Sequence, residues 1–137
     1  MSAGDDGEVI DRMFGALAAG DLTAVRGCYT ADGLVWHGFD GVALGLDAVL
    51  AQWRGLIDAF SEREVVDVRR QKIPGGFCQQ HVMVVRLADG GRKAWPVCIV
   101  VQIADGLIAR LDEYIDRAGF FTPPDDGPVV APGLSPR

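Results

Sequence analysis

Cysteine and histidine are scarce in this chain of 137 residues, which has three cysteines and two histidines. The cysteines, Cys28, Cys78 and Cys98, are odd in number and widely spaced. They match neither a disulfide framework nor a metal-ligand motif, so we expect reduced thiols in a cytoplasmic protein. The two histidines likewise have no spacing that would predict a metal site.

Basic residues and long apolar runs are also few. The chain has 13 lysines and arginines against 19 acidic residues, a net charge of −6. A negative surface repels phosphate backbones, so we expect no nucleic-acid partner. The longest apolar run, Val97–Val101, is far below the ~20 residues that span a bilayer. The first residues lack the basic and apolar regions of a signal peptide, and we expect no membrane partner.

The chain does have a large apolar fraction. Apolar residues make up 49% of the sequence and charged residues 23%, a composition typical of one folded domain. Because this fraction is high for so short a chain, it is consistent with a pocket lined by apolar side chains in addition to a core.

The first part of the chain has helical spacing. Apolar residues recur every three or four positions in three stretches, which predicts three amphipathic helices. Gly20 ends the first helix and Asp21 can cap the second, while Asp47 lies near the start of the third. The apolar positions are Val9, Ile10, Met13, Phe14 and Leu17, then Leu22, Val25 and Tyr29, then Leu46, Val49, Leu50, Trp53, Leu56, Ile57 and Phe60.

The second part reads as strands. A short strand at 34–37 precedes a loop at 38–45, and the runs 65–73, 77–87, 93–103 and 107–116 follow the third helix. Asp-Gly and Gly-Gly turns separate the last four runs, which predicts antiparallel hairpins and no phosphate-binding loop. The expected fold class is α+β, with three helices packed on a curved, mainly antiparallel sheet.

The two ends differ in composition from the rest. We expect a flexible N-terminus over 1–7 and a single domain over 8–121. Residues 122–137 are rich in proline, which predicts a mobile tail or an arm that lies over a partner.

Glu113 is the strongest candidate for chemistry. The alternate residues Leu107, Ala109, Leu111 and Ile115 are apolar, and period-two geometry places Glu113 on their face, toward the helices. Burial there would raise the pKa of the carboxyl, as a general acid or base near neutral pH requires. The alternative is a Glu that reaches water near the strand end.

Other candidates are less isolated. Asp112 and Asp116 fall on the opposite face, as surface or interface groups. Gln79 and His81 interrupt an otherwise apolar strand, and His81 could shuttle a proton or be a partly exposed or structurally hydrogen-bonded histidine. We also predict substrate contacts for a set that includes the three tryptophans, because pockets are mostly apolar. The set is Trp36, His37, Trp53, Gln79, Trp95 and Leu111.

Four local motifs resemble one superfamily. They are Ala-Gly-Asp-Leu at 19–22, Tyr-Thr-Ala-Asp-Gly-Leu-Val-Trp-His-Gly at 29–38, Trp-Pro-Val-Cys-Ile-Val-Val-Gln-Ile at 95–103, and Asp-Glu-Tyr-Ile-Asp at 112–116. With the order of elements, they resemble the nuclear transport factor 2-like superfamily, in its SnoaL-like, limonene-epoxide-hydrolase-like and ketosteroid-isomerase-like branch. The resemblance implies a conical half-barrel with an apolar pocket, dimerisation through the sheet, and chemistry without metal or cofactor.

The site residues depart from the known patterns of that superfamily. Glu113 matches the acidic residue that the epoxide hydrolases carry before Tyr-x-Asp. The Arg-x-Asp pair of the epoxide hydrolases is absent, and Gln79 and His81 are the nearest polar residues on the corresponding strand. Trp36 and Gly38 occupy the positions of the Tyr and Asn that hold the attacking water in those enzymes. In the isomerase pattern His37 stands nearest the catalytic base, while Met13 replaces the oxyanion tyrosine.

Two classes of function therefore stay open. The leading hypothesis is a cofactor-free enzyme that cyclises or isomerises an apolar cyclic molecule, such as a polyketide, terpene or steroid-like compound. In it Glu113 moves a proton that His81 orients or relays. The alternative is a non-catalytic binding or dimerisation domain, and a weaker one is an epoxide hydrolase. We expect a homodimer through the outer sheet face, which includes Ile108 and Tyr114.

Overall fold

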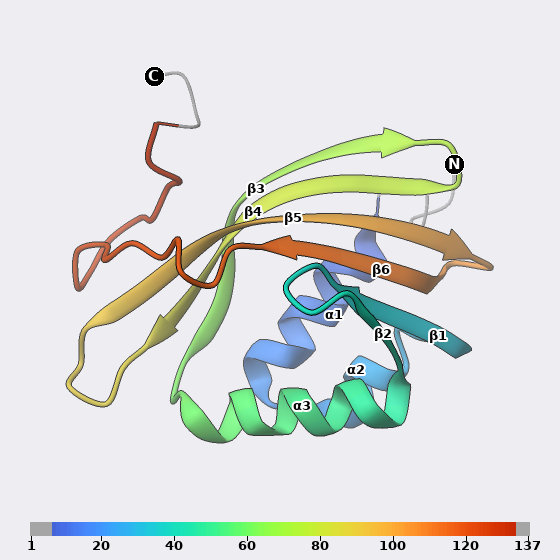
Figure 1. Cartoon of the computed structure of the whole chain (residues 1–137), viewed down its shortest axis with the longest axis horizontal. Helices are drawn as coiled ribbons and strands as arrows, with labels where there is room; N and C mark the ends of the chain where they lie inside the picture. The colour runs from blue at the N-terminus through green and yellow to red at the C-terminus, as the bar shows by residue number, and fades with distance from the viewer. Residues whose placement is uncertain (1–6, 134–137) are drawn as a thin grey trace.

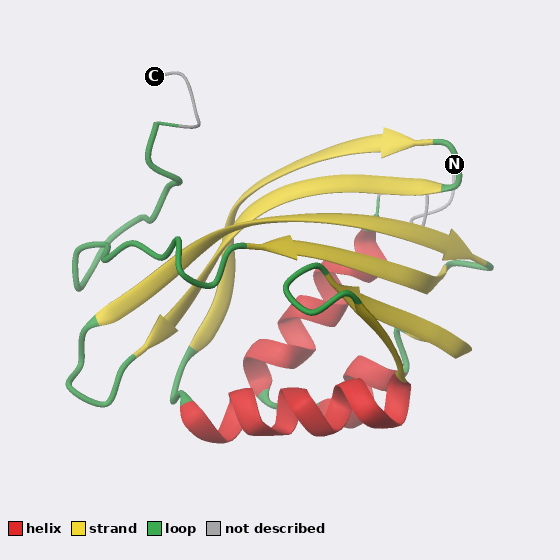
Figure 2. Cartoon of the chain, viewed as in Figure 1, coloured by secondary structure: helices red, strands yellow, loops and turns green. Residues whose placement is uncertain are grey.

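The computed structural model describes residues 7–133, so the predicted flexible N-terminus lies outside the described residues except for Gly7. Three helices and six strands follow one another along the chain (Figures 1 and 2). No helix in residues 7–133 is long and apolar enough to cross a membrane. The elements are α1 (Glu8–Ala19), α2 (Leu22–Arg26), β1 (Tyr29–His37), β2 (Val42–Gly45), α3 (Leu46–Ala59), β3 (Arg63–Ile73), β4 (Gly76–Arg86), β5 (Arg92–Ala104) and β6 (Leu107–Ile115).

The helices form where the periodicity predicts them. In α1 the buried residues are four members of the apolar stripe, and the helix ends at Gly20, whose φ of 74° is accessible to glycine at little cost. Asp21 caps α2 by accepting a hydrogen bond of 3.0 Å from the backbone N–H of Ala24. The four buried residues of α1 are Val9, Ile10, Met13 and Leu17.

The six strands form one open sheet in the order β2-β1-β6-β5-β4-β3. The last four strands make the predicted antiparallel meander. β1 and β6 pair in parallel, so the sheet is mixed. The helices lie against the concave face of this curved sheet (Figure 2), which confirms the predicted α+β architecture.

The segment between α2 and α3 differs from the prediction. β1 begins at Tyr29, within the residues predicted as a second helix, and 42–45 form the edge strand β2 instead of a loop. The Asp-Gly at 32–33 resembles a turn, but a break in the β1–β6 register between Tyr29 and Leu34 accommodates it. The predicted turn at 31–33 is therefore wrong, because these residues belong to β1, which starts five residues before the predicted strand.

The core lies between the concave face and the helices, and a β-bulge changes which β6 residues reach it. The β5–β6 register shifts between Gln102 and Ile103, so the strict alternation along β6 is broken. Ile108, predicted on the outer face, is fully buried in the core. The core comprises Val9, Ile10, Met13, Leu17, Val25, Cys28, Tyr29, Val35, Leu46, Val49, Leu50, Phe77, Val97, Ile99, Val101, Ile108 and Leu111.

Residues 122–133 pack on the outer face of the same chain's sheet. Phe121 forms an isolated bridge with Ala94 of β5, and Val129 and Ala131 bury against an outer-face cluster that includes Val82 and Val84. Arg92 holds this segment by donating to the carbonyl oxygens of Pro124 and Gly127. The composition predicted a tail or a partner-covering arm; the described part instead contacts its own sheet. The remaining tail residues, 134–137, lie outside the described part.

Candidate functional site

Glu113 lies on the inner face of the sheet, as the alternation along β6 predicts. Its neighbour on β5 is Ile99, a core residue, and its neighbour on β1 is His37. The side chain is only 15% exposed, and this burial raises the pKa of the Glu113 carboxyl to about 7. Both the protonated and the ionised form of the carboxyl are therefore accessible near neutral pH.

His37 faces Glu113 because parallel pairing of β1 with β6 aligns the two residues. The distance from His37 Nε2 to Glu113 Oε1 is 3.6 Å, a contact rather than a good hydrogen bond. Burial lowers the pKa of His37, with Arg117 adding to this and Asp40 opposing it. Burial thus favours the neutral form of both partners, and the pair is not a conventional ion pair.

An aromatic ring covers this pair. Phe39, in the turn after β1, stacks on His37 with 5.0 Å between ring centroids. The guanidinium of Arg117 lies 4.0 Å from the centroid of the Phe39 ring, a cation–π contact. Phe39 is itself 38% exposed, so its ring covers one face of the His37 imidazole at the surface.

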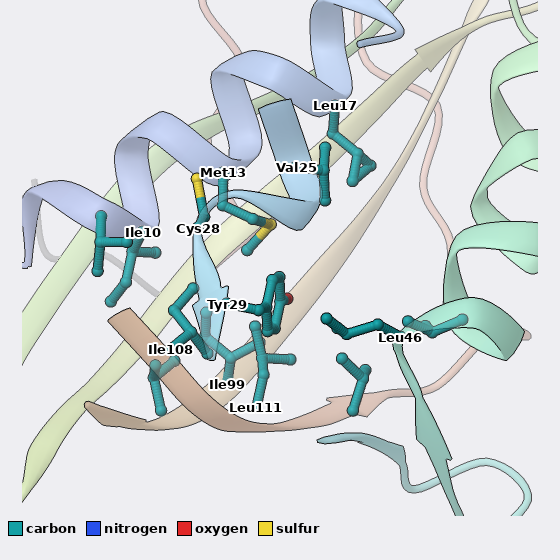
Figure 3. Close-up of a cluster of buried hydrophobic side chains, with 14 of the residues drawn as sticks. Ile10, Met13, Leu17, Val25, Cys28, Tyr29, Leu46, Ile99, Ile108 and Leu111 are labelled. Atoms are coloured by element: carbon teal, nitrogen blue, oxygen red, sulfur yellow. The ribbon is translucent and has the colours of Figure 1, made fainter. Parts of the chain in front are cut away.

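Tyr29 adds a polar group that the sequence analysis missed. Its ring lies among the core side chains at the start of β1 (Figure 3), and its buried hydroxyl has no hydrogen-bond partner among residues 7–133. Burial raises the pKa of Tyr29, and the charges of Cys28 and Glu113 raise it further. The sequence counted Tyr29 among apolar helix positions, where a phenol gives no separate signal.

Gln79 and His81 form a second polar cluster on β4. Gln79, Ile99 and Glu113 occupy one row across β4, β5 and β6. Since neighbouring strands lie about 4.8 Å apart, the two clusters are separated by roughly 10 Å. Gln79 Nε2 lies 3.0 Å from His81 Nδ1, and burial and two nearby arginines lower the pKa of His81 to about 4. The fold places Glu113 and His81 on one face and does not bring them into contact.

The aromatic candidates separate between the two faces. Trp36 points to the outer face, where it packs against Tyr114 with 5.2 Å between ring centroids. Trp53 and Trp95 pack at the edge of the core, and Trp95 Nε1 donates to the carbonyl oxygen of Arg117 at 3.0 Å. Leu111 is a core residue. Trp36 therefore cannot share a pocket with His37.

Four of the hollows that border the described chain are formed as follows. One, of about 270 Å³, is a cleft between α1 and β3, and a second borders it on the side of Met83. The others lie between α2 and α3 and on the outer face beside Cys78 and Cys98. Glu113 lines none of these four. The α1–β3 cleft is lined by Asp11, Phe14, Gly15, Ala18, Val65, Val68 and Gln79.

The cysteines and the other potential metal ligands lie apart from one another or in pairs. All three cysteines are free, with Cys78 Sγ and Cys98 Sγ 3.9 Å apart. Within the described part of the chain, no three His, Cys, Asp or Glu side chains come together as metal ligands.

Comparison with known proteins points to one family and one fold. The model of the SnoaL-like domain matches residues 10–111. Comparison with the curated proteins gives no significant match. Solved structures of similar fold share at most 18% identity in the examples that follow, so they establish the fold alone.

Three of these structures show which proteins share this fold. A protein of Xanthomonas campestris pv. campestris, provisionally assigned as a polyketide cyclase, has 15% identity and a TM-score of 0.70, with 82% of this chain and 90% of that chain covered. An epoxide hydrolase of Mycobacterium tuberculosis, similar to limonene epoxide hydrolase, has 18% identity and a TM-score of 0.69, with 84% and 85% covered. A protein of Catenulispora acidiphila with a ketosteroid isomerase-like fold has 13% identity and a TM-score of 0.72, with 82% and 88% covered.

Proposed function

Because the chain belongs to the family of SnoaL-like domains, we propose that it is a small enzyme that isomerises or cyclises an apolar cyclic molecule by acid–base catalysis. The substrate class is a polyketide, terpene or steroid-like compound. Two neighbours of the same fold support the choice of class, one provisionally assigned as a polyketide cyclase and one described as an epoxide hydrolase.

The observation that carries the proposal is the state of Glu113. A carboxyl whose pKa is raised to about 7 is available in both forms at neutral pH. Its carboxylate is a stronger base than an exposed one, and its acid form persists where an exposed Glu would be ionised. His37 contacts this carboxyl, and the charge of Glu113 raises the pKa of Tyr29. These two polar groups support the proposal as partners for the proton or for charge on the substrate.

The proposed reaction begins when the Glu113 carboxylate takes a proton from a carbon next to a substrate carbonyl, which leaves an enolate. In an isomerisation, Glu113 returns that proton to another carbon of the conjugated system. In a cyclisation, the enolate carbon attacks a second carbonyl carbon of the same molecule, and the proton goes to the new alkoxide oxygen. His81 orients the substrate from β4, so a molecule that contacts both residues spans roughly 10 Å, the length of a fused-ring compound.

Exchange of carbon-bound hydrogen tests this proposal without knowledge of the natural substrate. Cyclic ketones such as 2-tetralone are incubated with the protein in deuterated buffer at low buffer concentration, and NMR follows loss of the proton next to the carbonyl. We expect Glu113→Gln to abolish the protein-dependent exchange. The matched control is Asp112→Asn, because Asp112 is the adjacent carboxylate on the outer face, where it accepts from Arg110.

The non-catalytic alternative has its own supporting observation. The four hollows leave Glu113 without a lining role, and Glu113 and His81 are two strands apart. If the ketones bind while the wild type and Glu113→Gln give equal exchange, the chain is a binding domain and the acid–base proposal is wrong. The epoxide hydrolase alternative is weakened because Trp36, at the position of a water-holding residue, faces outward.

A further inference from the structure

A chain of hydrogen bonds leads from the surface to His81 and determines which of its ring nitrogens carries the proton. Arg70 Nε donates to Gln79 Oε1 at 2.8 Å, while the Arg70 guanidinium also pairs with Asp11. A guanidinium can only donate, so the Gln79 carbonyl oxygen must face Arg70 and the amide NH₂ must face His81. Because Gln79 Nε2 then donates to His81 Nδ1 at 3.0 Å, Nδ1 is an acceptor and carries no proton.

The single proton of the neutral ring is therefore on Nε2. Burial and the charges of Arg69 and Arg70 keep His81 neutral by lowering its pKa to about 4. The residue has 0% exposure, and Nε2 has no hydrogen-bond partner in residues 7–133. Buried N–H groups without a partner are rare in folded proteins, because water would otherwise satisfy them.

The group that packs on His81 is an aromatic ring rather than an acceptor. Phe14 of α1 lies against His81 in a T-shaped arrangement, with 5.1 Å between ring centroids. A ring face is at best a weak acceptor. Phe14 and Gln79 both line the α1–β3 cleft of about 270 Å³, and Phe14 and Met83 line the hollow beside it. Phe14 thus contacts His81 and also lines the cleft, so a ligand in the cleft reaches the imidazole only if the Phe14 ring moves aside.

We propose that His81 is a fixed hydrogen-bond donor. Its Nε2–H group donates to the carbonyl oxygen of an apolar ligand bound in the α1–β3 cleft. The ligand class is a ketone or quinone of one or two rings, since the cleft volume of about 270 Å³ is just below the usual range for small-molecule pockets. The identification of this ligand as the substrate rests on the proposed function. Donation from Nε2 replaces proton relay by His81 with polarisation of a carbonyl, because a neutral imidazole that only donates cannot pass a proton onward from Nδ1.

The first measurement addresses the wild-type protein directly. Nitrogen-15 NMR of the histidine rings at pH 8 distinguishes a protonated from an unprotonated ring nitrogen. We expect His81 to be protonated at Nε2 alone, and addition of 1-tetralone to shift this Nε2 signal. Protonation at Nδ1, or an Nε2 signal that 1-tetralone leaves unchanged, would overturn the proposal.

The second measurement uses a variant that should reverse the polarity of the ring. In Gln79→Glu a carboxylate replaces the amide, and it accepts from both Arg70 and His81, so the imidazole proton moves to Nδ1 and Nε2 becomes an acceptor. Work at pH 8 keeps the ring neutral although the new carboxylate raises the pKa of His81. The matched control is Gln80→Glu, which adds the same charge at the next residue, on the exposed outer face.

Binding of two probes reports the effect. The wild type and Gln80→Glu should bind 1-tetralone about tenfold more tightly than tetralin, which lacks the carbonyl, as one hydrogen bond would give. In Gln79→Glu this preference should fall to about onefold. Equal binding of the two probes by the wild type, or an unchanged preference in Gln79→Glu, contradicts the inference. Glu113→Gln should also keep the preference. If Glu113→Gln keeps the preference and still exchanges protons as fast as the wild type, the proposed function is refuted and this site stands.

Discussion

At the scale of single residues, Glu113 combines a functional advantage with a cost in stability. A buried carboxyl whose pKa is raised from 4.5 to about 7 is protonated in the folded chain over a range where the unfolded chain is ionised. The folded state then binds more protons than the unfolded state, so the free energy of unfolding falls as pH rises through this range. The full cost, about 3 kcal/mol, is present above pH 7.

The first prediction follows from this cost. Glu113→Gln should be as stable as the wild type at pH 4 and more stable by up to about 3 kcal/mol at pH 8. Urea unfolding at several pH values measures the difference. His37 and His81 have lowered pKa values, so they make the free energy of unfolding rise with pH in both proteins. The contribution of Glu113 is therefore read from the difference in free energy of unfolding between variant and wild type. A difference that stays constant with pH would contradict the raised pKa.

The second prediction concerns the pH dependence of catalysis. If the Glu113 carboxylate is the base, ketone exchange should increase about tenfold per pH unit well below 7 and level off above it, because the rate follows the ionised fraction. The exchange rate is measured from pH 5 to 9 by NMR. A profile that levels off near pH 4.5 would mean that an exposed carboxylate is responsible.

At the scale of elements, two irregularities in the sheet determine which side chains face the core and where the C-terminal segment attaches. The bulge between β5 and β6 moves Ile108 into the core. A second break, between Val66 and Arg69 of β3, leaves Asp67 at a φ of 52°, a conformation that non-glycine residues rarely adopt. Asp67 Oδ2 accepts a hydrogen bond of 3.0 Å from the backbone N–H of Ala131. The C-terminal segment is thus connected to the β3 bulge.

The third prediction tests whether this segment is part of the fold. Val129 is 7% exposed and Val130 is 44% exposed, so the two adjacent valines differ chiefly in burial. Val129→Asp should lower the free energy of unfolding by about 1–3 kcal/mol and speed hydrogen exchange over 122–133. Val130→Asp, the matched control, should change neither by much. Equal effects of both substitutions would show that the segment does not contribute to stability.

At the scale of the whole molecule, the outer face remains the expected dimer interface. Ile108 is buried in the core and does not contribute to this face. Trp36 and Tyr114 form an aromatic pair on the outer face, and Tyr114 is 51% exposed. Residues 122–133 cover the part of this face that β4 and the start of β5 provide. The uncovered part is the proposed contact between two copies.

The fourth prediction concerns that contact. At micromolar concentration the wild type should sediment as twice 14.7 kDa, and Tyr114→Lys should shift it toward the monomer, because a charge would be buried against the second copy. Val68→Lys serves as the control, since Val68 is a similarly exposed apolar residue on the edge strand β3. A wild type that sediments only as a monomer would refute the predicted dimer.

Local pattern by itself determined the three helices, the meander of the last four strands, the α+β class and the inward orientation of Glu113, because helical spacing, Asp-Gly turns and period-two alternation are properties of neighbouring residues. Only the tertiary structure decided which of these elements meet. The parallel pairing of β1 with β6 brings His37 to Glu113, and the order of the strands keeps His81 apart from both. Pairing and bulges depend on contacts between residues distant in sequence, and a single bulge is enough to move Ile108 from one face to the other.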